Sequence, residues 1–362
     1  MGGVRMKEVE TFLTKFVPNW KQESFLLAVS GGVDSMVLLE SFFELQKKIP
    51  TLQFLVVHIH HHLRKESDEE EEMVRNFCGE RNITLEVFHW EQGIVQTVGI
   101  EEKARKFRYQ KLEESMNKHK ASYVVVAHHA DDQVETVLMK LTRGSTLEGI
   151  AGMKPIRPFS EGYLIRPFLT VDKEELYEYA SIHQTPYRED ASNSSLEYTR
   201  NRFRKEIIPL LKQENSKLNQ KIQKFTQTLQ EQQELILNLA YQWMKQELVE
   251  LHNGWSWNRE NYMNQPLGLQ KVILVEISKK IGGLLSTKNV SDIQTAIVSD
   301  TSQLSLNLPK GWIFQKRYHQ LLIVKEEKKE IPYQEIRVEG VQSEDIVLSE
   351  DESISFKAEQ GW

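Results

Sequence analysis

A glycine-rich string near the N-terminus has the composition of a phosphate-binding loop. Two adjacent glycines let the backbone turn sharply and approach an anion, while amides at a helix start and serine hydroxyls donate hydrogen bonds to phosphate oxygens. Asp34 supplies a carboxylate where Mg²⁺ can bridge phosphates. A plain turn, with serine or aspartate capping the next helix, is the simpler alternative. The predicted loop comprises Ser30, Gly31, Gly32, Val33, Asp34 and Ser35.

A second polar string, AHHADDQVET, follows a later apolar run. Histidines and an aspartate at a strand end indicate binding or proton transfer. We predict catalytic roles for Asp34, Asp131 and His128, and we predict that both aspartates bind Mg²⁺. For Asp132 with Glu135, a capping box at the start of the following helix is an equally good interpretation.

Four histidines stand in the string HIHHHLR. Alternation along a strand would put His58, His60 and His62 on one face, which is compatible with a zinc site. We favour contact with nucleotide or substrate instead, because no cysteine or nearby carboxylate is arranged to complete the zinc coordination. The acid run at 66–72 is interpreted as the solvated start of a helix, where negative charge suits the helix dipole.

A predicted helix over 100–120 carries Glu101, Arg105, Arg108 and Tyr109 on one side. A surface ion pair between Glu101 and Arg105 is the simpler interpretation. The planar guanidinium group also suits a phosphate or a carboxylate. We therefore predict a catalytic role for Arg105 and substrate contact for Arg108.

These residues need a scaffold that brings the ends of several strands together. Short apolar runs alternate with helical patterns through the first 145 residues. This alternation predicts an α/β fold with a doubly wound, mainly parallel sheet, whose ligands bind beyond the carboxyl ends of the strands. The predicted strands are 25–29, 54–59, 83–88 and 123–127, and the predicted helices are 34–46, 67–81, 100–120 and 131–141.

The length of 362 residues exceeds one ordinary core. After residue 149, glycine and proline punctuate the chain before helical patterns at 173–183 and about 218–251. Two apolar runs, 304–308 and 312–324, predict a small hairpin with its turn at 309–311. We predict a catalytic domain over 1–210, a smaller, mainly helical domain over 211–325, and an acidic tail or the start of a further domain over 326–362.

Charge and cysteine content narrow the classes of function. The net charge is −6, yet residues 200–224 hold eight bases against two acids, so a polyanionic partner is not excluded. The single cysteine, Cys78, excludes an internal disulfide, a CxxC pair and a thiolate zinc site. The chain lacks an apolar run of about 18 residues and a leader-like N-terminus, so we expect a cytoplasmic protein without membrane contact.

The glycine-rich string resembles the SGGxDS signature of the PP-loop, or N-type, ATP pyrophosphatases. No Walker A motif competes with it, and no GxGxxG follows a predicted strand. The resemblance implies a loop that grips the pyrophosphate portion of ATP, in an enzyme that adenylates a carbonyl oxygen and releases AMP and pyrophosphate. ATP and Mg²⁺ are the implied cofactors.

Seven further strings narrow the resemblance to the tRNA(Ile)-lysidine synthetase family. The implied reaction joins L-lysine to C2 of the wobble cytidine, position 34, in an isoleucine tRNA with a CAU anticodon. Cytosine O2 is adenylated first, and the lysine amine then displaces AMP. The strings are HIHHHLR, IEEKARKFRY, AHHADDQVET, LTRGS, IRPFL, REDASN and YTRNRFRKEIIPLL.

The same resemblance implies tRNA binding by the helical domain and by the basic segment at 200–224, for which a solvated linker helix is the alternative. His62 stands near a position where the family usually has a glycine. Larger members carry a further C-terminal domain, so contact with the tRNA acceptor end is in doubt. Substrate or tRNA contacts are predicted for Arg108, Asp190, Asn193, Arg200, Asn201 and Arg204.

Two rival interpretations stay open. Another PP-loop enzyme, such as one that amidates a small metabolite, would use the loop without the basic segment. A non-catalytic RNA-binding protein would retain the nucleotide fold without turnover. Thiolating relatives are disfavoured because they use paired cysteines, and no amidotransferase module is visible. The oligomeric state is left open, with a homodimer among the options.

Overall fold

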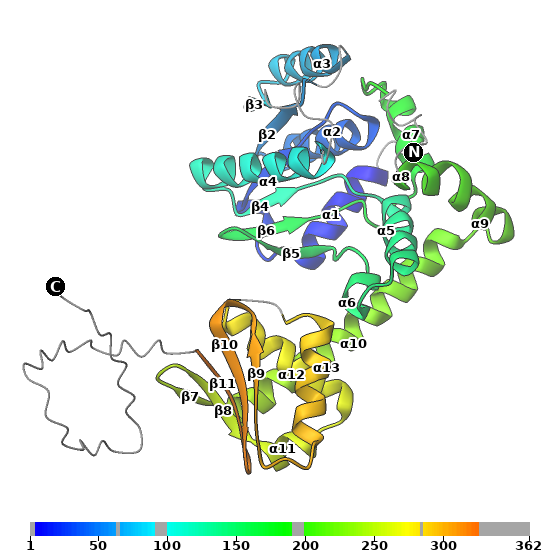
Figure 1. Ribbon diagram of the computed structural model, residues 1–362. Coiled ribbons are helices and arrows are strands. Elements are labelled where there is room, and N and C mark those ends of the chain that lie inside the picture. Colours follow the sequence, from blue (N-terminus) through cyan, green and yellow to red (C-terminus); the bar gives the residue numbers. More distant parts are fainter. Residues whose placement is uncertain (1–3, 63–65, 91–99, 190–198, 283–284, 326–362) are drawn as a thin grey trace, which may run out of the picture. The chain divides into compact units, whose positions relative to one another are not determined.

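The chain divides into two compact units, Met1–Tyr241 and Gln242–Trp362 (Figure 1). Within the described part of the chain, no helix combines the length and the apolar character that a membrane span requires. The computed structural model describes residues 4–62, 66–90, 100–189, 199–282 and 285–325.

A six-stranded sheet forms the centre of the first unit. Its strands lie in the order β3-β2-β1-β4-β6-β5, and every neighbouring pair is parallel except β5 with β6. The predicted α/β fold with a mainly parallel sheet is therefore confirmed. The sequence does not predict β5 and β6, because the glycines and prolines of this region indicate turns. Pro158 lies within β5, which is an edge strand, where a proline is tolerated. The strands are β1 (Ser24–Ala28), β2 (Gln53–His60), β3 (Leu85–His89), β4 (Tyr123–Val125), β5 (Ile156–Phe159) and β6 (Gly162–Ile165).

Both faces of this sheet are buried. Phe25 and Leu27 of β1 pack in a core that also holds side chains of α1, α2 and α7, whereas Leu26 packs with Leu112 and Met116 of α4. Burial on both faces explains why the strands appear in the sequence as continuous apolar runs. The helices of this unit are α1 (Val4–Phe16), η1 (Trp20–Gln22), α2 (Val33–Lys48), α3 (Glu66–Glu80), α4 (Ile100–His119), α5 (Ala130–Arg143), α6 (Leu147–Ile150), α7 (Lys173–His183), α8 (Thr199–Arg202), η4 (Phe203–Ile207), α9 (Ile208–Glu214) and α10 (Leu218–Glu247).

Strand order places two polar segments side by side. β1 pairs with β2 on one side and with β4 on the other, so the connections from this central region run toward opposite edges of the sheet. Such a reversal opens a crevice at the carboxyl ends of the strands. The glycine-rich loop follows β1 and the histidine–aspartate string follows β4, so both reach the same crevice.

The second unit corrects the prediction of a mainly helical domain. It contains a five-stranded antiparallel sheet in the order β7-β8-β11-β10-β9. The predicted hairpin with its turn at 309–311 is confirmed, but the run 312–324 forms two strands rather than one. The turn between them lacks glycine and proline, and Tyr318 adopts a left-handed φ of 51° there. The elements are β7 (Val249–Leu251), β8 (Gly254–Asn258), α11 (Arg259–Met263), α12 (Leu267–Lys280), α13 (Thr287–Val298), β9 (Gln303–Leu308), η5 (Pro309–Gly311), β10 (Trp312–Arg317) and β11 (Gln320–Lys325).

Gly254 of β8 provides a test of this second sheet. A Cβ added there would lie 2.1 Å from the carbonyl oxygen of Ile323 in β11. We expect Gly254→Ala to destabilise the second unit by at least about 2 kcal/mol, because the backbone of β11 would have to shift to relieve the contact. Urea unfolding followed by tryptophan fluorescence measures the change.

Gly268→Ala is the matched control, because a Cβ at Gly268 in α12 meets open space. Alanine should be neutral or stabilising in that helix. Equal unfolding midpoints for Gly254→Ala and the unsubstituted chain would contradict the close packing of β8 on β11.

Candidate active site

The glycine-rich loop connects β1 to α2 and leaves the helix start open to an anion. Gly32 is the N-cap of α2, and no side chain caps the amides of its first turn. Ser35 Oγ instead accepts a hydrogen bond from the Ser30 N–H at 3.1 Å and donates one to the Gly32 carbonyl at 2.9 Å. Val33, the first residue of α2, is buried. This geometry disfavours the simpler interpretation of a turn capped by serine or aspartate.

Gly31 is required by the path of the loop. Its φ of +92° lies in the region that L side chains rarely adopt. A Cβ there would also lie 3.1 Å from the Cβ of Glu70 in α3. The Gly31 carbonyl accepts a hydrogen bond from the Arg188 N–H at 3.0 Å. The loop is therefore held between α3 and the segment that follows α7.

Asp34 lies in the first turn of α2, where it faces groups from two other elements. Lys173 Nζ, from the start of α7, donates a hydrogen bond to Asp34 Oδ1 at 2.5 Å. His129 Nε2 lies 3.6 Å from Asp34 Oδ2. The structure thus brings the aspartate of the loop to the string that follows β4.

Asp131 lies on the other side of the same histidine. Its Oδ2 accepts a hydrogen bond from the Lys173 N–H at 3.0 Å, and its Oδ1 accepts one from Lys212 Nζ at 2.6 Å. His129 Nδ1 is 3.7 Å from Oδ2. Burial alone would raise the pKa of Asp131, but the contacts with His129, Lys212 and Lys173 outweigh it and hold that pKa well below its usual range.

His129 is the residue that links the two predicted aspartates, and the sequence prediction selected its neighbour instead. Its imidazole is buried, and Nε2 also lies 3.4 Å from Asp132 Oδ2. Burial would lower the pKa of His129, but the charges of Asp132, Asp131 and Asp34 overcome this effect and raise it. The His129 imidazole therefore lies among three carboxylates, between the loop and the start of α5.

His128 has a different environment. Burial lowers its pKa to about 3, helped by the positive charges of Arg166, Arg200 and Arg105 against the opposing effect of Asp132. The imidazole is therefore uncharged at neutral pH, so it can serve as a hydrogen-bonding group but not as a proton donor of ordinary strength.

Several guanidinium groups lie around His128. Arg105 is exposed, with its guanidinium 5.1 Å from the centre of the Tyr109 ring. Burial lowers the pKa of Arg108, and the like charges of Arg105 and Arg200 lower it further. The Glu101 side chain lies outside the described residues, so the proposed Glu101–Arg105 pair is not addressed.

Arg166, directly after β6, is a further cation, for which the sequence alone predicts no separate role. Its side chain is buried and donates to the Lys154 carbonyl at 2.7 Å. Burial lowers its pKa to about 10, with a contribution from the like charges of Arg157 and Arg105. Concentrated positive charge of this kind favours an anionic ligand.

Asp132 and Glu135 bind two arginines, and Asp132 Oδ2 also accepts a hydrogen bond from the His129 N–H at the start of α5, at 3.1 Å. Arg200 donates to Glu135 Oε2 at 2.6 Å and to Asp132 Oδ1 at 2.8 Å. Arg204 donates to Glu135 Oε1 at 2.5 Å and approaches Asp132 Oδ1 at 3.3 Å. The N-cap of α5 is His129, so the capping box of Asp132 with Glu135 is wrong. We call this set of four side chains the acid–arginine network.

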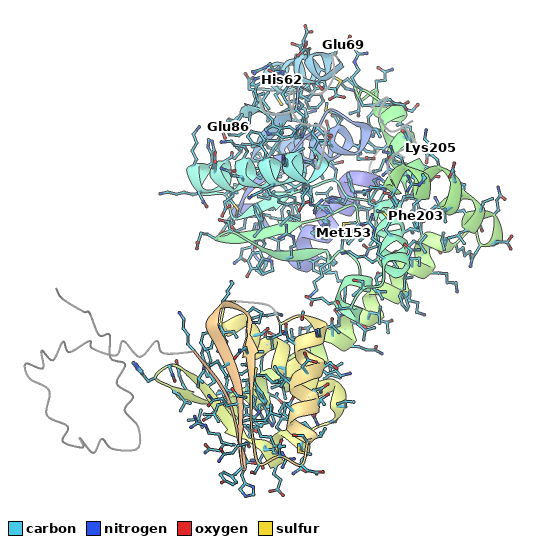
Figure 2. The ribbon with its side chains drawn as sticks, in the orientation of Figure 1. His62, Glu69, Glu86, Met153, Phe203 and Lys205 are labelled. Carbon is cyan, nitrogen blue, oxygen red and sulfur yellow. The ribbon has the colours of Figure 1, made fainter. Side chains whose placement is uncertain are left out.

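The segment around the acid–arginine network has an inner and an outer face. Phe203 packs with Val134 and Ile208, whereas Lys205 is exposed on the outer side of the helix (Figure 2). Asn201 is buried. Asp190 and Asn193, both predicted to contact substrate, lie outside the described residues.

Comparison with known proteins identifies the family. A family model described as a PP-loop domain matches residues 6–211. The tRNA(Ile)-lysidine synthase of Bacillus subtilis (strain 168) is 34% identical over 354 residues, which cover 95% of this chain and 74% of that protein. The chain belongs to the tRNA(Ile)-lysidine synthase family. The synthase of Geobacillus kaustophilus (strain HTA426) is 37% identical over 305 residues, covering 82% of this chain and 66% of that protein.

Some members of the tRNA(Ile)-lysidine synthase family are much longer. The bifunctional protein TilS/HprT of Listeria innocua serovar 6a is 34% identical over 322 residues, and this chain spans only 50% of its length. Among solved structures, the U34-tRNA thiolase NcsA from Methanococcus maripaludis aligns with a TM-score of 0.53 at 17% identity, covering 64% of this chain and 80% of that one. At this low identity, the likeness shows a shared fold alone.

We expect the acid–arginine network to stabilise the folded state, whether or not a ligand is bound. Glu135 is 1% exposed and binds both arginines. We expect Glu135→Gln to lower the free energy of unfolding by about 1–3 kcal/mol, because the amide cannot satisfy two guanidinium groups. Urea unfolding measures the loss.

Glu148→Gln, which changes an exposed glutamate of α6 in the same way, is the control and should stay within about 0.5 kcal/mol of the unsubstituted chain. If Glu135→Gln proved as stable as this control, the network would not hold the segment in place.

Proposed function

We propose that the protein is an ATP-dependent ligase, a tRNA(Ile)-lysidine synthetase acting in the cytoplasm. It would join L-lysine to C2 of the wobble cytidine, position 34, in an isoleucine tRNA with a CAU anticodon, and release AMP and pyrophosphate. The observation that carries this proposal is the uncapped start of α2 beside Asp34, in a chain of this family.

The proposed reaction has two steps. Cytidine O2 attacks the α-phosphorus of ATP, and the bond from that phosphorus to the pyrophosphate oxygen breaks. The lysine amine then attacks C2, the C2–O2 bond breaks, and AMP leaves while the nitrogen loses a proton. The cytidine has to leave its base stack to be reached, as it does in other enzymes that act on a base.

The loop would bind the leaving pyrophosphate. Amides at the start of α2 carry partial positive charge, and the hydroxyls of Ser30 and Ser35, 3.2 Å apart, border the same turn. Electrostatic stabilisation of the charge that develops on pyrophosphate is the main contribution that we assign to this loop.

Asp34 fits a magnesium ion better than Asp131. Mg²⁺ usually takes one or two carboxylates with phosphate oxygens and water. Among the described residues, Asp34 Oδ2 has only the 3.6 Å approach of His129, whereas both oxygens of Asp131 accept hydrogen bonds, from Lys173 and Lys212. We therefore propose Asp34 as the first carboxylate for Mg²⁺, which would neutralise phosphate charge, and Asp131 only with displacement of Lys212.

The guanidinium groups beside His128 would stabilise the adenylating transition state. Arg105 and Arg108 lie on α4, and Arg166 lies at the end of β6, so their charge is directed at the crevice from two elements. We propose that Arg105 acts through charge on the α-phosphate and that Arg108 contacts substrate. Uncharged His128 would orient a reacting group by hydrogen bonding.

Contacts with the tRNA backbone suit the exposed lysines better than the paired arginines. Arg200, Arg204 and Lys212 already bind carboxylates. We therefore assign phosphate contact chiefly to four exposed lysines of η4, α10 and the segment before α10, and we assign Arg200 and Arg204 to the walls of the substrate site. The four are Lys205, Lys217, Lys221 and Lys224.

The proposed function predicts ATP-dependent transfer of labelled lysine to tRNA. The full chain is incubated with ATP, labelled lysine and bulk tRNA, and label in precipitated tRNA is counted. We expect Asp34→Asn to lower the initial rate at least about 100-fold, because the carboxylate proposed to hold Mg²⁺ against the phosphates is lost.

Glu113→Gln, at an exposed glutamate of α4, should keep the rate. Transfer at an undiminished rate by Asp34→Asn would refute the assignment of Asp34. Absence of ATP-dependent label with the unsubstituted chain would refute the proposed function itself.

The exposed lysines should determine the salt dependence of tRNA binding. We expect a chain with both Lys221→Gln and Lys224→Gln to bind tRNA more weakly, with the slope of log affinity against log salt reduced by about 1.5–2. Filter binding between low and physiological salt measures the slope. Lys48→Gln, at the exposed end of α2, is the control. An unchanged slope in the double variant would favour the rival enzyme that acts on a small metabolite.

A further inference from the structure

Three histidines gather at the carboxyl ends of β2 and β3, outside the crevice described above. His60 ends β2 and stands in parallel register with His89, which ends β3. His62 lies two residues beyond the end of β2, with a left-handed φ of 50°, and its ring centre is 3.9 Å from that of His60. Figure 2 shows His62 near helix α3. We call His60, His62 and His89 the histidine cluster.

The ring nitrogens of the histidine cluster lie close enough to share one metal ion. One nitrogen from each ring lies within 4.8 Å of the other two. His62 Nε2 and His89 Nδ1 are 2.9 Å apart, near the separation of about 3.3 Å that two ligands have on a tetrahedral zinc ion. Two neutral imidazoles at this distance share one proton, and a metal ion can take its place.

Carboxylates of α3 lie beside two of the rings. Asp68 Oδ1 lies 2.9 Å from His60 Nε2, and Glu71 Oε2 lies 3.7 Å from His89 Nε2. A carboxylate at Nε2 favours the tautomer whose proton is on Nε2 and whose lone pair is on Nδ1. His60 Nδ1 accepts a long hydrogen bond from the His62 N–H at 3.2 Å, which agrees with that tautomer. Metal-bound histidines are usually supported by carboxylates in this way.

We propose that the histidine cluster is a binding site for a divalent transition-metal ion of the zinc type. The ligands are Nδ1 of His60, Nε2 of His62 and Nδ1 of His89, with water in the fourth position. The metal ion would replace the long hydrogen bond that His60 Nδ1 accepts from the His62 N–H. Imidazole nitrogens suit zinc, nickel, cobalt and copper, whereas Mg²⁺ and Ca²⁺ require oxygen ligands. The site is separate from the Mg²⁺ proposed at Asp34, and it does not depend on the proposed ligase activity.

A metal ion here would act on the same helix that borders the phosphate loop. Asp68 and Glu71 tie α3 to the ends of β2 and β3. One turn of that helix also places Glu70 against Gly31. Binding of the metal would therefore favour the position of α3 that is seen here, and it should raise the thermal stability of the chain.

Zinc binding is measured with the full chain, free of any affinity tag and stripped with a chelator. Dialysis against zinc in excess Mg²⁺, followed by elemental analysis, should give one zinc per chain, and titration calorimetry gives the affinity. We expect His62→Gln and His89→Gln each to weaken binding at least about tenfold. Both side chains reach solvent, so the substitutions should not disturb folding.

His252→Gln is the matched control, because His252 is an exposed histidine of the second unit. Cobalt provides an independent readout, since a tetrahedral Co²⁺ site absorbs visible light that both cluster variants should lose. The proposal is overturned if the stripped chain retains no zinc, or if His62→Gln and His89→Gln bind it as tightly as His252→Gln does.

Discussion

Neutralisation of buried acids is the constraint on which the first unit depends. Asp131, Asp132 and Glu135 stand together in the first turns of α5, largely withdrawn from water. Placing an unpaired ion there costs on the order of several kcal/mol. The helix start offsets part of this cost, and the rest is met by cations that lie 65 to 81 residues further along the chain, Arg200 and Lys212 among them. The acids thereby hold the α8–α9 segment against α5.

The same ion pairs assemble the crevice. Lys173 joins its two sides, because its ammonium group binds Asp34 while its backbone N–H binds Asp131. His129 lies between these aspartates and contacts both. Contacts that hold the C-terminal part of this unit in place are consequently also contacts of the site. Loss of activity in a charge variant here therefore has to be compared with its stability before it is assigned to chemistry.

The sequence predicts local structure and chemical type better than long-range pairing. The loop at 30–35 and the parallel sheet follow from short-range patterns, and so does the position of both aspartates after predicted strands. The sequence does not predict the partners of these aspartates. Lys173 is 139 residues from Asp34, and no spacing rule connects them. The sequence does not distinguish His129 from His128, because adjacent histidines differ only in the elements that they face. The second sheet was missed because a turn such as that at Tyr318 has no glycine or proline.

Helix α3 provides a second example of contacts that the sequence does not predict. Its acid run at 66–72 has the composition of a solvated helix start, which does not indicate a contact with the histidines of β2. In the structure, Asp68 and Glu71 face two histidines, and Glu69 lies 3.4 Å from Arg188. Charged residues on an exposed helix are ordinary, so their composition carries no information about which of them face a neighbour. Only the packing of α3 over the ends of the strands distinguishes a solvated run of acids from one that orients imidazole rings.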